Sequence, residues 1–258
     1  MNINQLVIFG STSSIAKALL PNLNIEPNQI FSVDRVNSKQ NANDFIPREN
    51  QFRLDWDNVS EIEKFVVTIL NERLIGPVLV LNFMGYFGQI ERIEDLDIAD
   101  ALTTNSKNLL PFLLLAKHAK FMPPGTRIIS FSGAGVGGDN LDDSSLGYLA
   151  AKASMALLAE SIDQQLARYE IRFGLIAPGA FPSRMQAVVA QEDSRKIPEL
   201  RISRAKEVMS SNASTEKLAH LVGFLADNPD LLGGRTWSAN FDVLTDQQGN
   251  FGRLRRFH

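Results

Sequence analysis

The segment Leu6-Val-Ile-Phe9-Gly10-Ser-Thr-Ser-Ser14-Ile-Ala16 joins a continuous apolar run to a turn of small residues. Such a run is typical of a strand buried on both faces, as in a parallel sheet. Small side chains let the backbone approach a pyrophosphate, and the following helix would direct free N–H groups and its positive dipole end at that anion. A plain turn with a capping serine is the alternative, because one of the three usual glycine positions is glycine.

The rest of the chain alternates between strand and helix patterns. Further strands are predicted at 30–33, 52–54, 78–81, 128–131, 171–176 and 237–241, and helices at 15–23, 60–70, 109–121, 149–169 and 215–227. The Ser60-Glu-Ile-Glu63 segment has the pattern of a capping box. Alternating strands and helices predict βαβ units in an α/β fold, a doubly wound parallel sheet with helices on both faces. Since no repeat or linker divides the chain, we expect residues 1–258 to form a single domain.

The composition excludes several classes of function. The 258 residues carry a net charge of −3, which gives no general attraction to nucleic acid or anionic lipid. The absence of cysteine excludes disulfides and thiolate sites, and three scattered histidines make a metal site unexpected. No apolar run approaches the ~18 residues of a membrane span, and the N-terminus lacks the basic region of a signal peptide. We therefore expect a cytoplasmic protein without a membrane or nucleic-acid partner.

Asp34 and Arg35 follow the second predicted strand, about 20 residues after the first turn. An acidic side chain at this place accepts hydrogen bonds from an adenosine ribose and repels a 2′-phosphate, which favours NAD over NADP. The guanidinium of Arg35 could instead attract that phosphate. The alternative interpretation of both residues is a solvated strand end.

Tyr148 and Lys152 lie four residues apart and therefore on one face of a predicted helix. A cation beside a phenol favours the phenolate and lowers its pKa from about 10, which would make the tyrosine an acid or base near neutrality. The pair opens the helix that follows the strand ending in Ser130-Phe-Ser132.

From Gly10 to Phe241 the chain resembles the short-chain dehydrogenase/reductase family. The turn at 10–16, Asp55 after the third strand, the Asn82-Phe-Met-Gly85 segment and the Pro178-Gly-Ala-Phe-Pro-Ser183 segment are similar to family motifs. The resemblance implies a Rossmann-type fold and hydride transfer between NAD(P) and a secondary alcohol or ketone. It implies four catalytic residues: Tyr148 exchanges the proton, Lys152 holds the nicotinamide ribose, Ser132 orients the carbonyl, and Asn105 fixes a proton-relaying water.

The resemblance also implies a cofactor site. Its residues would be Gly10, Thr12, Ser13, Ser14, Ile15, Asp34, Arg35, Asp55, Trp56, Asn82, Phe83, Gly85, Tyr148, Lys152, Pro178, Gly179, Phe181 and Ser183. The polar, irregular segment 183–214 would form a mobile lid over a small-molecule substrate. We further expect a homodimer or homotetramer.

Some positions depart from the family pattern. Ser14 and Ala16 replace glycines, and Phe83 with Met84 replaces small residues beside the adenosine. An ungapped alignment from Arg127 puts the usual catalytic serine position at Gly133, one residue after Ser132. Two alternatives therefore stay open: a non-catalytic dinucleotide-binding regulatory protein, and a nucleotide-sugar epimerase or dehydratase, which the closing segment 232–242 faintly favours.

Overall fold

The computed structural model describes residues 3–36, 43–133, 145–211 and 215–239. Within them, seven strands form one sheet in the order β3-β2-β1-β4-β5-β6-β7, and every neighbouring pair is parallel. The strands are β1 Gln5–Phe9, β2 Ile30–Arg35, β3 Gln51–Leu54, β4 Val78–Asn82, β5 Arg127–Phe131, β6 Arg172–Ala177 and β7 Thr236–Ser238. Leu6 pairs with Ile30 on one side and with Leu79 on the other, so the strand order reverses at β1. Ligands of doubly wound sheets bind at such a reversal.

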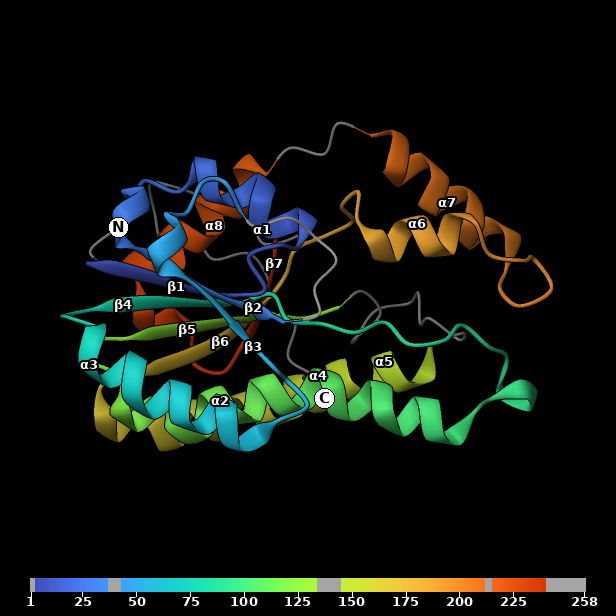
Figure 1. The fold of residues 1–258 in the computed structure, drawn as a ribbon. Helices are drawn as coiled ribbons and strands as arrows, with labels where there is room; N and C mark the ends of the chain where they lie inside the picture. Colours follow the sequence, from blue (N-terminus) through green and yellow to red (C-terminus); the bar gives the residue numbers. More distant parts are fainter. Residues whose placement is uncertain (1–2, 37–42, 134–144, 212–214, 240–258) are drawn as a thin grey trace.

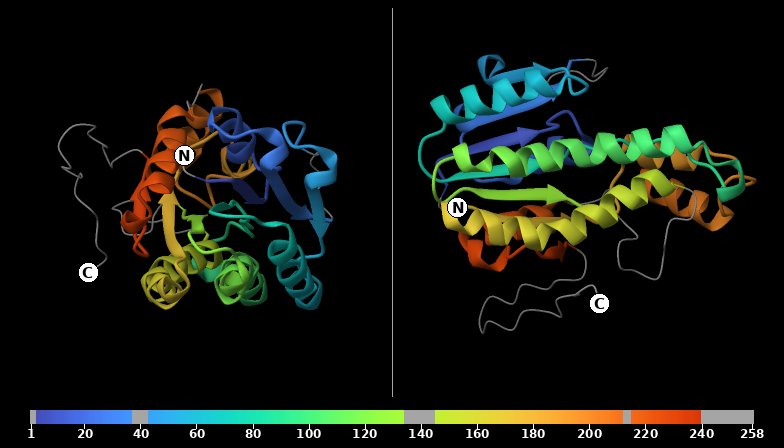
Figure 2. Two further views of the ribbon diagram at one scale, coloured as in Figure 1. Left: turned by 90° about the vertical axis from the view of Figure 1, so that its left-hand side faces the viewer. Right: turned by 90° about the horizontal axis from the view of Figure 1, so that it is seen from below.

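Helices cover both faces of this sheet (Figure 1). On one face lie α1 Ser14–Leu19 and α8 Glu216–Asp227, and on the other α2 Val59–Phe65, α4 Ile98–His118 and α5 Leu146–Leu166. A five-residue π-helical stretch, Val66–Leu70, connects α2 to the short α3 Asn71–Arg73. The long helices α4 and α5 run side by side (Figure 2), and α6 Arg184–Ala190 and α7 Glu199–Ser210 lie beyond the strand ends. The predicted doubly wound α/β fold is confirmed.

Alternate residues of the strands supply two separate cores. Val7, Phe9 and Val80 pack with residues of α4 and α5, whereas Leu6 and Ile8 pack with residues of α1 and α8. This two-sided burial explains why the central strands are apolar at successive positions. None of the helices in the described ranges combines the length and hydrophobicity that a membrane-spanning segment needs.

Several element boundaries differ from the sequence prediction. Helix α4 begins at Ile98 rather than at 109, and Asp97 caps it by accepting bonds from the amides of Ala99 and Asp100. The predicted capping box at Ser60 is wrong: Asn58 caps α2 and accepts a bond from the Glu61 amide. The segment 183–214 was predicted to be irregular, but its described part, 183–211, contains the helices α6 and α7. The predicted end of the last strand, 240–241, lies outside the described residues.

Candidate active site

The predicted site residues gather at the carboxyl ends of the strands. The turn at 10–15 follows β1, Asp34 and Arg35 end β2, and Asp55 with Trp56 follows β3. Asn82 ends β4, Ser132 follows β5, and Pro178 follows β6. Of the predicted catalytic residues, Asn105 lies on α4, and Tyr148 and Lys152 lie on α5.

Gly10 lies in a sharp turn, and neighbouring backbone atoms leave little space for a side chain there. Its φ is +83°, and a Cβ there would lie 3.2 Å from backbone atoms of both Phe83 and Met84. Only glycine meets both the backbone angle and the close approach. Ser13 caps the N-terminus of α1, and its Oγ accepts a hydrogen bond of 3.1 Å from the Ala16 amide.

Asp34 is buried and binds the turn. Its Oδ2 accepts a bond of 2.6 Å from Ser11 Oγ, and its Oδ1 accepts bonds of 3.1 Å from both the amide and the hydroxyl of Thr12. The carboxylate thus fixes the loop between β1 and α1, a role that sequence reasoning did not assign to it. It also places a buried negative charge beside that loop.

A groove of about 790 Å³ lies between the ends of β2 and β3 and one side of α4. Arg35, Asp55, Trp56, Asp57 and Lys107 line part of it. The Trp56 ring packs edge-on against Phe9, and its buried indole N–H has no hydrogen-bond partner among the described residues. Burial lowers the pKa of Arg35, although the Asp57 carboxylate opposes the shift. A groove whose walls carry both signs of charge fits the polar groups of an adenosine.

The segment after β4 turns its bulky side chains into the protein. The Phe83 ring stacks on Phe131 with centroids 4.0 Å apart and planes 14° apart, and Met84 is buried. Asn82 donates a bond of 3.2 Å to Ser130 Oγ and accepts one of 3.1 Å from the Met84 amide. The large side chains at 83 and 84 therefore pack against other residues of the protein.

Tyr148 is partly enclosed by three neighbours. The Phe87 ring meets it edge-on with centroids 5.4 Å apart, and Lys152 Nζ lies 5.4 Å from its ring centroid. A Cβ placed on Gly133 would lie 2.9 Å from its hydroxyl oxygen. Burial raises the pKa of Tyr148 to about 12, so the expected lowering of this pKa by Lys152 is wrong for this arrangement. The reason is that the phenol is desolvated and the ammonium faces its ring.

Lys152 is almost completely buried. Its ammonium donates a bond of 2.9 Å to the Phe131 carbonyl oxygen and lies 3.8 Å from the Met155 sulfur. Burial lowers the pKa of Lys152 to about 8. An ammonium has three donors, so at least one remains for a ligand hydroxyl.

Two serine hydroxyls near this pair are buried without a partner among the described residues. Ser132 is 5% exposed and follows β5, and Ser145 is 1% exposed and precedes α5. Ser145 is the N-cap residue of α5 and lies three residues before Tyr148 in the sequence. Sequence reasoning found Ser132 but missed Ser145, although this spacing was a readable signal.

Asn105 and Asn108 both lie on α4, but their surroundings differ. Asn105 is partly exposed. Asn108 is buried: its Oδ1 accepts a bond of 3.1 Å from the Tyr86 amide, and its Nδ2 donates to the carbonyls of Tyr86 at 2.6 Å and Thr104 at 2.8 Å. Asn108, which sequence reasoning missed, therefore anchors the segment after β4 to α4.

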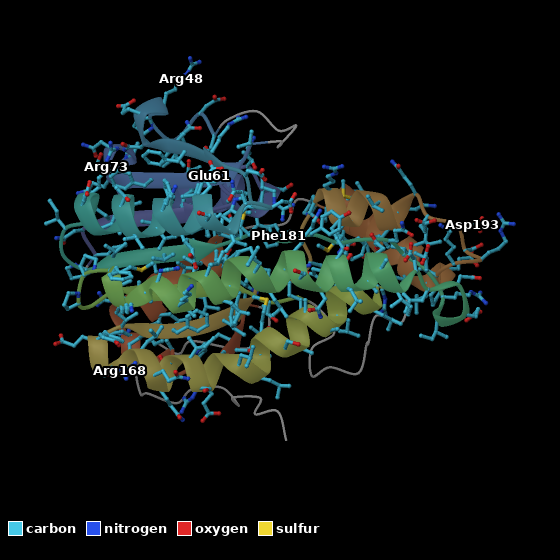
Figure 3. The ribbon with its side chains drawn as sticks, turned by 60° about the horizontal axis from the view of Figure 1, so that its bottom comes forward. Arg48, Glu61, Arg73, Arg168, Phe181 and Asp193 are labelled. Atoms are coloured by element: carbon cyan, nitrogen blue, oxygen red, sulfur yellow. The ribbon has the colours of Figure 1, made fainter. Side chains whose placement is uncertain are left out.

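The segment after β6 leads from the sheet to α6 and α7. Gly179 has a φ of +86°, Phe181 is buried in the core with α1 and α8, and Ser183 caps α6. Figure 3 shows Phe181 where the sheet gives way to these helices and Asp193 at their outer end. Residues 183–211 are named the α6–α7 arm below.

A small apolar cluster holds the arm near Tyr148. It contains Val189, Ile197 and Ile202 of the arm, together with Ile90 from the segment before α4. Phe87 packs against this cluster and also against Tyr148. The arm therefore reaches the tyrosine through Phe87, a contact that sequence reasoning missed.

The carboxyl edge of the sheet carries a protonated phenol, a buried ammonium and two unused hydroxyls at β5 and α5. It also carries a groove with charged walls at the ends of β2 and β3. In the described part of the chain, no cluster of His, Asp and Glu could hold a metal ion. A phenol and an ammonium at the end of a doubly wound sheet can transfer a proton to the oxygen of a ligand that the groove helps to bind.

Comparisons with known proteins agree with this geometry. A family model described as enoyl-(acyl carrier protein) reductase matches residues 10–232. A curated protein from Diaporthe leptostromiformis, short-chain dehydrogenase/reductase PhomF, is 32% identical over 79 residues, which are 31% of this chain and 27% of that protein. The chain thus spans only about a quarter of the curated relative that it matches.

Solved structures show the same fold. A short-chain dehydrogenase/reductase from Saccharomyces cerevisiae has a TM-score of 0.73 at 14% identity, with 97% of this chain and 100% of that chain covered. A short chain dehydrogenase family protein from Francisella tularensis has a TM-score of 0.69 at 16% identity, with coverages of 92% and 96%.

Proposed function

Because the chain belongs to the short-chain dehydrogenase/reductase family, we propose that it is an NAD(P)-dependent oxidoreductase that acts on a secondary alcohol or ketone. The observation that carries this proposal is the convergence of Tyr148 and the buried Lys152 ammonium at the carboxyl end of β5. A nicotinamide cofactor supplies or accepts the hydride in this chemistry. Gly10, Asp34, Trp56 and Lys152 would be among the residues that hold it.

Tyr148 is the proton donor in this mechanism. With a pKa of about 12 its hydroxyl is protonated near neutral pH, so it can give a proton to a ketone oxygen as the carbonyl carbon gains a hydride. Lys152, with a donor to spare, would hold a ribose hydroxyl.

A hydroxyl from Ser132 or Ser145 would orient the substrate carbonyl. Both hydroxyls are buried and have no partner among the described residues, so each can still donate a hydrogen bond. Losing one such donor lowers turnover by about 10²-fold. Comparing Ser132→Ala with Ser145→Ala identifies the donor, and unchanged turnover in both would exclude a serine from this role.

We propose that the cofactor is NAD. The buried Asp34 carboxylate beside the first turn disfavours a 2′-phosphate, whereas Arg35 and Lys107 in the groove attract one. The test is a titration of the protein with NAD and NADP in parallel, in which binding is measured by the change in tryptophan fluorescence. NADP binding tenfold tighter than NAD, a difference of about 1.4 kcal/mol, would contradict this proposal.

The α6–α7 arm is proposed as the substrate lid, because its apolar cluster is linked to Tyr148 through Phe87.

A second proposal concerns assembly. Leu113 of α4 and Leu157 and Leu158 of α5 are exposed on adjacent helices, which supports a homodimer formed through these helices.

The experiment that tests the activity is the oxidation of NADH or NADPH in the presence of a panel of ketones. Ketone-dependent oxidation that yields the alcohol supports the enzyme. The absence of the usual serine at position 133 favours the rival, a non-catalytic dinucleotide-binding protein. That rival predicts tight cofactor binding with no turnover on any ketone.

A further inference from the structure

Gly133 is a glycine for a reason other than its backbone. Its φ does not lie in the left-handed range in which a glycine is favoured. It is buried two residues after the end of β5, and a Cβ there would lie 2.9 Å from both the Cε1 and the hydroxyl oxygen of Tyr148 and 3.1 Å from Lys152 Cγ. Real side chains do not tolerate contacts of 2.9 Å, so one of the partners would have to move.

We infer that Gly133 is a positioning residue: it leaves free the space beside β5 that the Tyr148 hydroxyl occupies, and any side chain at 133 displaces that hydroxyl. Of the close neighbours, the end of the tyrosine side chain moves most easily. The Lys152 ammonium is tied to the Phe131 carbonyl, which restrains its stem.

Phe87 limits where the displaced ring can go. It stands edge-on to Tyr148 and is itself packed against the apolar cluster of the arm. Tyr148 is therefore held between the bare backbone of Gly133 and the Phe87 ring. A ring pushed away from Gly133 must either press on Phe87 or turn toward solvent.

This inference reverses the expectation from the family pattern. Position 133 is where the ungapped alignment puts a catalytic serine. If the protein merely lacked that serine, Gly133→Ser should raise the rate of ketone reduction. Here the added Cβ expels the proton donor, and we expect Gly133→Ser to lower ketone reduction at least tenfold. That consequence rests on the proposed function, whereas the placement of Tyr148 does not.

The decisive test is a tyrosine titration that needs no substrate. The ionisation of Tyr148 is isolated as the ultraviolet difference between each protein and its Tyr148→Phe counterpart, at alkaline pH values where circular dichroism shows a folded chain. In the wild type we expect no ionisation of Tyr148 below pH 11, because burial raises its pKa to about 12. In Gly133→Ala the displaced phenol should ionise at least one pH unit earlier.

Gly174→Ala is the matched control. It adds a Cβ at a buried glycine of β6, 2.8 Å from Leu232, without touching Tyr148. It should lower stability but leave the tyrosine titration unchanged. If Gly133→Ala fails to fold, the added change Phe87→Ala gives the ring room to move, and this double variant should fold and ionise Tyr148 earlier than Phe87→Ala alone does.

Identical Tyr148 titrations in Gly133→Ala and the wild type would overturn the inference, as would a gain of turnover in Gly133→Ser. Early ionisation without any ketone reduction by the wild type would leave the inference standing and contradict the proposed function instead.

Discussion

The ammonium of Lys152 is buried away from solvent. Its folded-state pKa of about 8, against 10.5 for a free lysine, means that the folded protein resists protonation at this amine. The shift corresponds to about 3 kcal/mol of destabilisation at neutral pH, where the amine is protonated in both the folded and the unfolded chain. The cofactor-free protein is therefore less stable because of Lys152. Such a loss of stability is expected for a residue that binds a ligand rather than one that stabilises the fold.

Lys152→Met should therefore stabilise the cofactor-free protein by about 1–3 kcal/mol at pH 7, since the charge is removed and one charged hydrogen bond is lost. Wild-type stability should also rise between pH 8 and pH 10, because the folded state releases its proton before the unfolded state does. Urea unfolding at several pH values measures both effects. A variant less stable than the wild type at pH 7, with the same pH dependence, would show that Lys152 is a structural residue.

Asp34 joins the turn to β2 through three hydrogen bonds. Asp34→Asn keeps the shape but removes the charge, so it should lower stability by about 1–3 kcal/mol and shift the preference from NAD toward NADP. The measurements are urea unfolding and paired cofactor titrations. Asp57→Asn is the control: it removes an exposed carboxylate from the groove at the ends of β2 and β3 and should leave stability unchanged. An equal effect of the two changes would remove the special role of Asp34.

Helix α4 shows what a sequence pattern can and cannot specify. Its apolar half, near 109–121, was predicted because it packs on the sheet. Its first half, from Ile98, was missed because much of it is exposed and has no clear apolar stripe. Asn105 and Asn108 lie in or beside that missed half, and only the rotation of the helix decides which of them faces the segment after β4.

Asn108→Ala should lower stability by about 2 kcal/mol or more, because it leaves the Tyr86 amide and carbonyl without their partner. Asn105→Ala, three residues away on the same helix, should change stability by less than about 0.5 kcal/mol. Guanidinium unfolding of the two variants compares them directly. The reverse ranking would show that Asn105, rather than Asn108, has the structural role.

The strands and the order of the site motifs were predictable, because each central strand is buried on both faces and reads as a continuous apolar run. The arm was not. Its helices pack on each other through a small cluster, so α7 carries many polar residues and resembles a loop in sequence. The pKa of Tyr148 was also beyond sequence reasoning, since it depends on burial and on the direction in which the Lys152 ammonium points.

The proposed dimer makes a prediction about the outer face of α4 and α5. Leu157 is 75% exposed, and Leu157→Lys should convert a dimer to a monomer by placing a charge in the interface. Leu200→Lys makes the same change at a leucine of α7 that is 61% exposed, and it should leave the assembly intact. Light scattering after size exclusion gives the mass of each protein. A monomeric wild type would contradict the dimer.

In the proposed mechanism Tyr148 donates the proton in ketone reduction, while other residues bind the cofactor. Tyr148→Phe keeps the ring and its contact with Phe87 but removes the hydroxyl. The most direct measurement is the turnover of an accepted ketone by this variant and the wild type, together with the dissociation constant of NADH for each. We expect turnover to fall by about 10²-fold or more with NADH affinity unchanged. Equal turnover in the two proteins would contradict the claim.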